Sequence, residues 1–157
     1  MTITPDIRQM EILMVEDNPT DVLLAKEALS NVKTVNYVHV AQDGIEAMEF
    51  LHQEGQFAKA PRPDLIFLDL NMPRKNGHEV LTEIKADAGL RSIPVLILTT
   101  SKATTDIVKA YACHANCYII KPVDFDHFTL AIQSVQDFWF AVATLTSSEL
   151  VEQRNGS

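Results

Sequence analysis

The segment LIFLDLNMPRKNG, residues 65–77, decides how the rest of the chain is interpreted. It begins with an apolar run typical of a strand that is buried on both faces, and this run ends at Asp69. A buried carboxylate without partners costs several kcal/mol or takes up a proton. Asp69 therefore needs partners from elsewhere in the chain, and the fold determines which residues can supply them.

Short apolar runs alternate with helical patterns along the chain. Further strands are predicted at EILMV (11–15), VNYVHV (35–40), VLILT (95–99) and CYII (117–120). Helices are predicted to begin near Asn18, Asp43, Asn76, Ala103 and Asp124. Five strands alternating with five helices, joined by short loops, predict an α/β fold with a parallel sheet and helices on both faces.

The composition is that of one globular domain. The chain has 157 residues, 46% of them hydrophobic, and we expect a domain over residues 1–145 with a long last helix, then a frayed tail at 146–157. The formal charge of −8 disfavours nucleic acid and anionic membranes as partners. The sequence shows neither a long apolar run nor a signal peptide, and its two cysteines lack metal or redox spacing, so we expect a cytoplasmic location.

Polar residues stand at the ends of four of the predicted strands. Right-handed crossovers place these ends on one edge of the sheet, where the sites of open parallel sheets lie. The residues are Glu16 and Asp17 after the first strand, Asp69 after the third, Thr99 and Thr100 at the fourth, and Lys121 and Pro122 after the fifth. Glu16 and Asp17 both reach this edge only if the chain curls there, which Asn18-Pro19 favours. The partners of Asp69 are therefore expected in this group.

The three acids of this group predict a metal site. Clustered carboxylates raise each other's pKa unless a cation lies among them. Oxygen ligands with room for water suit Mg²⁺ or Mn²⁺, and the scattered histidines and cysteines form no set suited to zinc. Such an ion keeps open positions that can receive a phosphoryl group, so Glu16, Asp17 and Asp69 are expected to form a phosphate-binding metal site.

The same group contains a nucleophile and a counter-charge. In this setting the carboxylate of Asp69 can attack a phosphoryl group in line and form an acyl phosphate. We expect Lys121 to be the fixed cation and Thr99 to bond a phosphoryl oxygen. The Lys121–Pro122 peptide bond is a candidate for the cis form, which would aim the ammonium into the cleft.

With these residues in place, the chain resembles the receiver domains of two-component response regulators from about residue 11 to 140. The matching motifs are VEDN (15–18), LDLNMP (68–73), the glycine at 77, LTTS (98–101) and YIIKP (118–122), in this order. The resemblance implies a flavodoxin-like, doubly wound (βα)5 fold with strand order 2-1-3-4-5.

The resemblance also implies roles for the residues of the site. Asp69 would accept a phosphoryl group from a histidine kinase, and Glu16, Asp17, Asp69 and the backbone carbonyl of Asn71 would surround Mg²⁺. Glu16 replaces the commoner aspartate, a change that we expect to be harmless.

Two further positions concern the switch that the resemblance implies. Thr99 would move towards the phosphoryl group, and Tyr118 would rotate inwards behind it. Thr100 is larger than the alanine or glycine often found at this position. We expect it to restrict water and small phosphodonors and to slow hydrolysis.

The expected partners follow from the same resemblance and from the aromatic residues near the end of the chain. The family commonly adds an output domain, for which this chain ends too soon, so we expect the surface change to be read by another protein or the phosphoryl group to be passed on. The stretches GQFAKAPRPDLIFLDLNMP, NCYIIKPVDFDHF and SVQDFWF are similar to regulators paired with cyanobacterial phytochrome histidine kinases. Phe138-Trp139-Phe140 cannot all face one core, so we expect a homodimer or kinase-docking face there.

Two other functions stay open. A phosphatase or phosphotransferase with an aspartyl nucleophile would need a second acid two residues after Asp69, where the chain has Asn71. A scaffold that binds partners without phosphorylation would not need the complete set of acids, threonine and lysine. We therefore expect self-catalysed phosphoryl transfer and slow loss of the group rather than enzymatic turnover.

Overall fold

The structure is a computed structural model, and it describes residues 10–30, 36–121, 126, 130 and 133. The chain divides into two compact units, residues 1–123 and 124–157. All strands and helices named below belong to the first unit. Asp124, at which the last helix was predicted to begin, the aromatic residues 138–140, Pro122 and the tail lie outside the described residues, and the 1–145 domain boundary stays a prediction.

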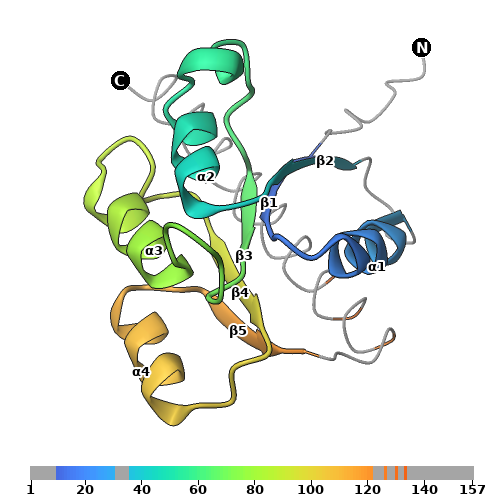
Figure 1. Cartoon of the computed structure of the whole chain (residues 1–157), viewed down its shortest axis with the longest axis vertical. Helices are drawn as coiled ribbons and strands as arrows, with labels where there is room; N and C mark the ends of the chain where they lie inside the picture. The colour runs from blue at the N-terminus through green and yellow to red at the C-terminus, as the bar shows by residue number, and fades with distance from the viewer. Residues whose placement is uncertain (1–9, 31–35, 122–125, 127–129, 131–132, 134–157) are drawn as a thin grey trace, which may run out of the picture. The chain divides into compact units, whose positions relative to one another are not determined.

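Five parallel strands form one sheet in the order β2-β1-β3-β4-β5, as predicted (Figure 1). The strands are β1 (Met10–Val15), β2 (Asn36–Ala41), β3 (Leu65–Leu68), β4 (Val95–Thr99) and β5 (Cys117–Ile120). The strand order reverses between β1 and β3, so a crevice is expected beyond the carboxyl ends of these two strands.

Helices cover both faces of the sheet. They are α1 (Pro19–Ser30), α2 (Gly44–Leu51), α3 (Gly77–Ala86) and α4 (Thr104–Ala112), and a short 3₁₀ helix, η1 (Gly55–Phe57), lies in the predicted loop after α2. α2, α3 and α4 follow one another on one face, and α1 lies on the other (Figure 1). Among the described residues, none of the helices has the length and apolar character of a membrane span.

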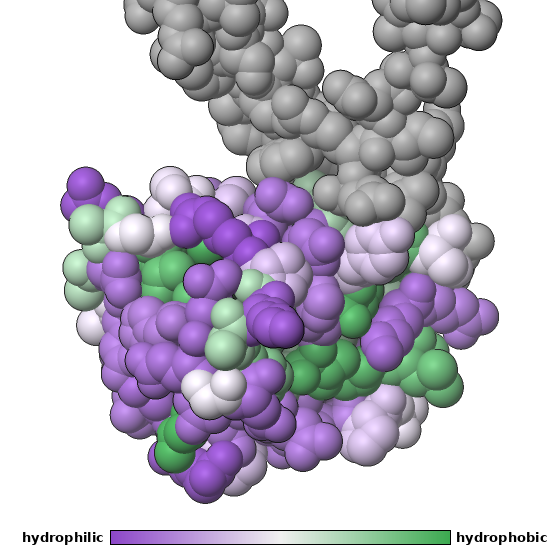
Figure 2. All heavy atoms as spheres, turned by 90° about the horizontal axis from the view of Figure 1, so that it is seen from above, coloured by the Kyte–Doolittle hydropathy of each residue, from purple (hydrophilic) through white to green (hydrophobic). Residues whose placement is uncertain are grey.

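The core follows from the two-residue period of the strands. Alternate residues of β1, β3 and β4 join the apolar faces of α2 and α3 in one cluster. The cluster members on these three strands are Leu13, Val15, Ile66, Leu68, Val95 and Ile97, and Ala41 of β2 also belongs to the cluster. Residues between them are buried as well, because the sheet is covered on both faces. Figure 2 shows one face of the molecule, where polar side chains cover most of the surface and apolar ones appear in between.

Three of the described helices, α1, α2 and α3, begin at polar residues whose side chains cap them. The side chain of Asn18 accepts a hydrogen bond from the N–H of Thr20 at 2.9 Å, at the start of α1. The side chains of Asp43 and Asn76 accept from the backbone three residues later, at the starts of α2 and α3. The starts of α1 and α3 are thereby fixed close to the ends of β1 and β3.

The loop between β3 and α3 is held against the start of α2. Arg74 has a φ of 65°, which costs a residue other than glycine about 1 kcal/mol or more. Its guanidinium donates to the buried carboxylate of Asp43, and the Nε–Oδ2 distance is 3.0 Å. Gly44 allows close approach, because a Cβ there would overlap the backbone and side chain of Lys75. An ion pair and a close contact thus fix the loop that follows Asp69.

Replacing Gly77 by alanine is expected to lower the free energy of unfolding by about 1–3 kcal/mol. A Cβ at this position would overlap the backbone of Asp69 and Leu70. Urea unfolding measures the loss. Gly89→Ala is the control, since its Cβ would meet only a carboxylate oxygen of Asp87 at 3.3 Å. Equal losses in both variants would contradict a constraint at Gly77.

Asp43→Asn keeps a residue that caps helices well and removes the charge that faces Arg74. Burial raises the pKa of Asp43, but hydrogen bonds from Glu46 and Arg74 outweigh it, and the pKa lies below its ordinary value of 3.8. A lowered pKa stabilises the fold above pH 3.8, and this contribution is lost as the pH falls through the folded-state value. We expect the variant to be about 1 kcal/mol less stable near neutral pH.

Urea unfolding of the wild type and of Asp43→Asn at several pH values tests this expectation. The two curves should converge as the pH falls into the acid range. A difference in stability that persists unchanged in acid would mean that the charge of Asp43 is not its cause.

Candidate functional site

Backbone hydrogen bonds align the ends of the strands at one edge of the sheet. Val15 of β1 pairs with Leu68 of β3, and the N–H of Asp69 donates to the carbonyl of Val15 at 3.1 Å. The N–H of Lys121 donates to the carbonyl of Thr99 at 2.7 Å. The parallel register thus brings together residues that are far apart in the sequence, as predicted for strand ends.

Glu16, Asp17 and Asp69 form an acidic cluster at this edge. One carboxylate oxygen of each lies within 4.8 Å of the others, and Asp17 is exposed whereas the other two are buried. The N–H of Asn18 donates to Oε1 of Glu16 at 3.2 Å, so the chain turns directly after β1. This turn is the predicted curl, and it brings both acids to the same side.

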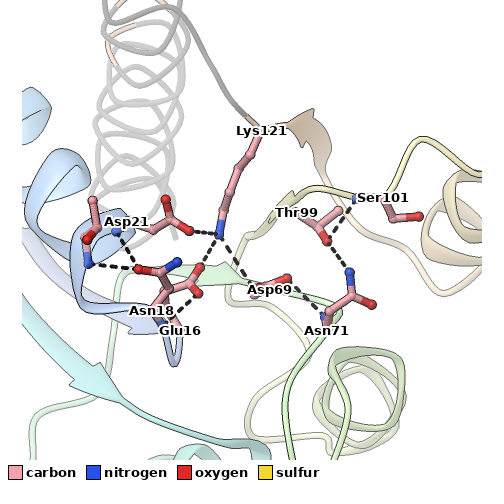
Figure 3. A network of polar contacts seen from close by, with 9 residues as sticks. Glu16, Asn18, Asp21, Asp69, Asn71, Thr99, Ser101 and Lys121 are labelled. Carbon is pink, nitrogen blue, oxygen red and sulfur yellow. Dashed lines mark hydrogen bonds and ion pairs between the residues drawn. The ribbon is translucent and has the colours of Figure 1, made fainter.

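The ammonium of Lys121 lies between carboxylates from three parts of the chain (Figure 3). It donates to Oε2 of Glu16 and, at 2.9 Å, to Oδ2 of Asp21, and it lies 3.5 Å from Oδ2 of Asp69. Burial lowers the pKa of Lys121, but the hydrogen bonds to Glu16 and Asp21 more than reverse this, and the pKa lies above its ordinary value. Lys121 is therefore a fixed positive charge.

One ammonium does not balance the acids around it. Burial raises the pKa of Glu16 to about 7, and although Lys121 opposes this, the charge of Asp69 adds to the rise. Burial is the main cause of this rise and one ammonium does not cancel it, so a second cation beside Glu16 would favour its ionised form. The donors are all oxygen atoms at a separation that one ion can span, so the cluster fits a divalent cation.

On the other side of Asp69, hydrogen bonds reach Asn71 and Thr99 (Figure 3). Oδ1 of Asp69 accepts from the backbone N–H of Asn71 at 3.0 Å. The hydroxyl oxygen of Thr99 accepts from the side-chain amide of Asn71 and from the N–H of Ser101, both at 3.4 Å. These two bonds are long, so the buried hydroxyl of Thr99 is only weakly held.

Tyr118 connects β5 to the loop after β4. Its hydroxyl donates to the backbone carbonyl of Ser101 at 3.0 Å. Burial raises the pKa of Tyr118, which keeps the hydroxyl protonated and able to donate. Thr100, between Thr99 and Ser101, is exposed. Thr99 and Tyr118 are therefore both linked to Ser101, one through its N–H and the other through its carbonyl.

Two polar residues of the site were not assigned a role from the sequence. From the sequence, Asp21 is simply an acid close to the predicted helix start at Asn18, and Ser101 is the last residue of the LTTS motif. A signal for Asp21 existed, because α1 begins at Pro19, two residues after Asp17, and its first turn therefore lies near the same edge. Ser101 follows β4 by two residues, but its side-chain partner belongs to α4.

Comparisons with known proteins agree with this geometry. The model of the response regulator receiver domain family matches residues 12–133. Response regulator Rcp1 of Synechocystis sp. is 40% identical over 137 residues, which cover 87% of this chain and 93% of Rcp1.

Two solved structures have the same fold. The phosphorylated cyanobacterial phytochrome response regulator RcpA is 44% identical, with a TM-score of 0.77 over 86% of this chain and 96% of that one. The Mn²⁺-bound form of Rcp1 is 41% identical, with a TM-score of 0.75 over 83% of this chain and 94% of that one. The similarity extends over nearly the whole length of both relatives, so the chain belongs to the family of response regulator receiver domains.

Proposed function

We propose that Asp69 accepts a phosphoryl group from the phosphohistidine of a sensor histidine kinase and that the resulting surface change, or the phosphoryl group itself, is passed to another protein. One observation carries this proposal: the Asp69 carboxylate lies 3.5 Å from the ammonium of Lys121 inside the acidic cluster. A nucleophile, a counter-charge and candidate metal ligands therefore share one edge of the sheet. Membership of the receiver family supports the same function.

The chemistry requires little from the protein beyond position and charge. An oxygen of Asp69 forms a bond to phosphorus while the bond between phosphorus and the histidine nitrogen of the kinase breaks. The electron pair of that bond stays on the imidazole, which takes up a proton. Lys121 stabilises the charge on the phosphoryl oxygens, and the hydroxyl of Thr99 donates to one of them.

We place Mg²⁺, or Mn²⁺ as a substitute, among Glu16, Asp17, Asp69 and the backbone carbonyl of Asn71. Such an ion, when bound, supplies positive charge to the phosphoryl oxygens. The set of oxygen donors supports this assignment, as does the Mn²⁺-bound form of Rcp1.

The switch that we propose involves Thr99, Thr100 and Tyr118. The long hydrogen bonds of Thr99 leave its hydroxyl able to turn towards a phosphoryl group on Asp69. Tyr118 contacts the same loop through Ser101 and responds to that movement. Thr100, exposed beside Thr99, restricts the access of water and small phosphodonors and slows hydrolysis.

The partner that we propose is a phytochrome-type histidine kinase in the cytoplasm. RcpA, at 44% identity, is a cyanobacterial phytochrome response regulator, and this supports the assignment. We also propose that the aromatic residues 138–140 form either a homodimer contact or a face that docks the kinase. We also propose that the receiver domain covers residues 1–145, a longer range than residues 12–133, which match the family model.

A switch fits the site better than an enzyme with turnover. An aspartyl phosphatase needs a general acid two residues after its nucleophile. Asn71 occupies that position, and its side chain donates to Thr99 instead. The phosphoryl group is therefore expected to stay on Asp69 until hydrolysis or transfer removes it.

Asp69→Asn is expected to abolish phosphorylation. The wild type, incubated with Mg²⁺ and a phosphorylated histidine kinase, should take up one label that is sensitive to base and to hydroxylamine, as an acyl phosphate is. The variant should take up none. Asp64→Asn is the matched control, because Asp64 precedes the same strand and bonds the N–H of Glu11, away from the acidic cluster. Label that persists in Asp69→Asn would exclude Asp69 as the acceptor.

Lys121→Met is expected to separate metal binding from phosphoryl transfer. Removing the ammonium leaves the acidic cluster more negative, so Mg²⁺ affinity measured by calorimetry should rise by about threefold or more. Phosphorylation should slow by about a hundredfold, because an electrostatic stabiliser of the transferring group is lost. A variant that loses metal binding together with phosphorylation would show that Lys121 only maintains the fold of the site.

A further inference from the structure

Three side chains outside the acidic cluster form a chain of hydrogen bonds between α3, α4 and the loop after β4. Nε2 of His78, at the start of α3, lies 3.0 Å from Oδ1 of Asp106, in the first turn of α4. The hydroxyl of Ser101 donates to the other oxygen, Oδ2, of Asp106 at 2.5 Å. We call this chain the His78–Asp106–Ser101 brace.

The proton positions in the brace follow from its chemistry. The hydrogen bonds from Ser101 and His78 hold the pKa of Asp106 below its ordinary value, so its carboxylate is ionised and can only accept. Nε2 of His78 therefore carries the hydrogen that it donates. One oxygen of Asp106 accepts from His78 and the other accepts from Ser101, so the carboxylate links these two side chains.

The other ring nitrogen of His78 shows that this contact orients the ring. Nδ1 is buried and has no hydrogen-bond partner among the described residues. A buried polar atom without a partner destabilises the fold, so the ring does not take this orientation to satisfy Nδ1. The bond from Nε2 to Asp106 is the polar contact that selects it.

One end of the brace lies next to the loop of Asp69, and the other end reaches the hydrogen-bond partner of Tyr118. His78 follows Gly77, whose N–H donates to the carbonyl of Leu70 at 3.1 Å, directly beyond Asp69. At the other end, Ser101 offers its carbonyl to the hydroxyl of Tyr118. The brace therefore connects the loop of Asp69 to the residue that accepts the hydrogen bond of Tyr118.

We infer that His78 and Asp106 are positioning residues, which hold the backbone carbonyl of Ser101 where the hydroxyl of Tyr118 meets it. The inference rests on the proposed function in one respect, since the effect of the Tyr118 contact on the phosphoryl site requires that the site works as proposed. The positioning itself is a property of the free protein.

A purely structural role is the alternative. Ala103 stands at the N-cap of α4 and has no side chain that can cap the helix. The negative charge of Asp106, in the first turn, therefore also stabilises α4 by facing the positive end of the helix dipole. Loss of such a role would lower stability without acting through Tyr118. The experiment therefore has to measure coupling between the brace and the Tyr118 hydroxyl.

The first measurement uses the full chain without ligand. Isotopically labelled tyrosine gives ring signals for the three tyrosines, and Tyr118→Phe identifies that of Tyr118. His78→Phe, which keeps a ring and removes the donor, and Ser101→Ala, which keeps the carbonyl, should both shift and broaden the Tyr118 signal. His52→Phe is the matched control, because it breaks a similar bond, from His52 Nε2 to Asp87 Oδ2 at 3.1 Å, at the far end of α3.

The second measurement is a double-mutant cycle on the binding of beryllofluoride, a phosphoryl analogue, with Mg²⁺. His78→Phe and Ser101→Ala should each weaken binding by about twofold to tenfold, the range expected for one hydrogen bond. In the Tyr118→Phe background the same changes should have no further effect. Asp106→Asn, which can still accept from one neighbour and donate to the other, should bind closer to the wild type than Asp106→Ala does.

The outcomes separate the two proposals. An unchanged Tyr118 signal in His78→Phe and Ser101→Ala overturns the brace, and so does a loss of binding that is equal in the two backgrounds. A wild type that does not bind beryllofluoride while its Tyr118 signal still responds to the brace variants would refute the proposed function and leave the positioning role intact.

Discussion

The architecture of the site depends on the attraction between one ammonium and the carboxylates that surround it. Lys121 pairs with Glu16, Asp21 and Asp69, and Asp17 adds a further negative charge at the exposed side. Mutual repulsion would drive these acids apart if the sheet and the start of α1 did not hold their backbones in place. The excess of negative charge that remains is what makes this edge suited to a divalent cation and, through it, to phosphate.

Most of the frame that holds these charges could be predicted from the sequence. Short apolar runs that alternate with capped helices define a parallel sheet, and a parallel sheet places all its carboxyl ends on one edge. Asp69 and Lys121 could be assigned to this edge because each directly follows an apolar run. Adjacent strand residues point to opposite faces, so Glu16 and Asp17 can share this edge only if the chain turns at Asn18. The structure contains that turn.

The contacts between loops could not be predicted in the same way. Asp21 reaches Lys121 from a helix, so its place depends on where α1 starts and on how it is rotated about its axis. The bonds of His78 and Asp106 depend on side-chain rotamers at the starts of two different helices. Patterns of hydrophobicity fix strands and helices, but they carry little information about which rotamers polar residues adopt between them.

The contacts on the two sides of Asp69 differ in how closely they hold the chain. On the α2 side, the left-handed backbone of Arg74 is anchored by Asp43, and the glycines at 44 and 77 let adjoining segments touch without a gap. On the β4 side, the hydroxyl of Thr99 is held by two bonds of 3.4 Å. We therefore expect a group added to Asp69, as proposed, to displace the hydroxyl of Thr99 before it displaces the loop that Arg74 and Asp43 hold.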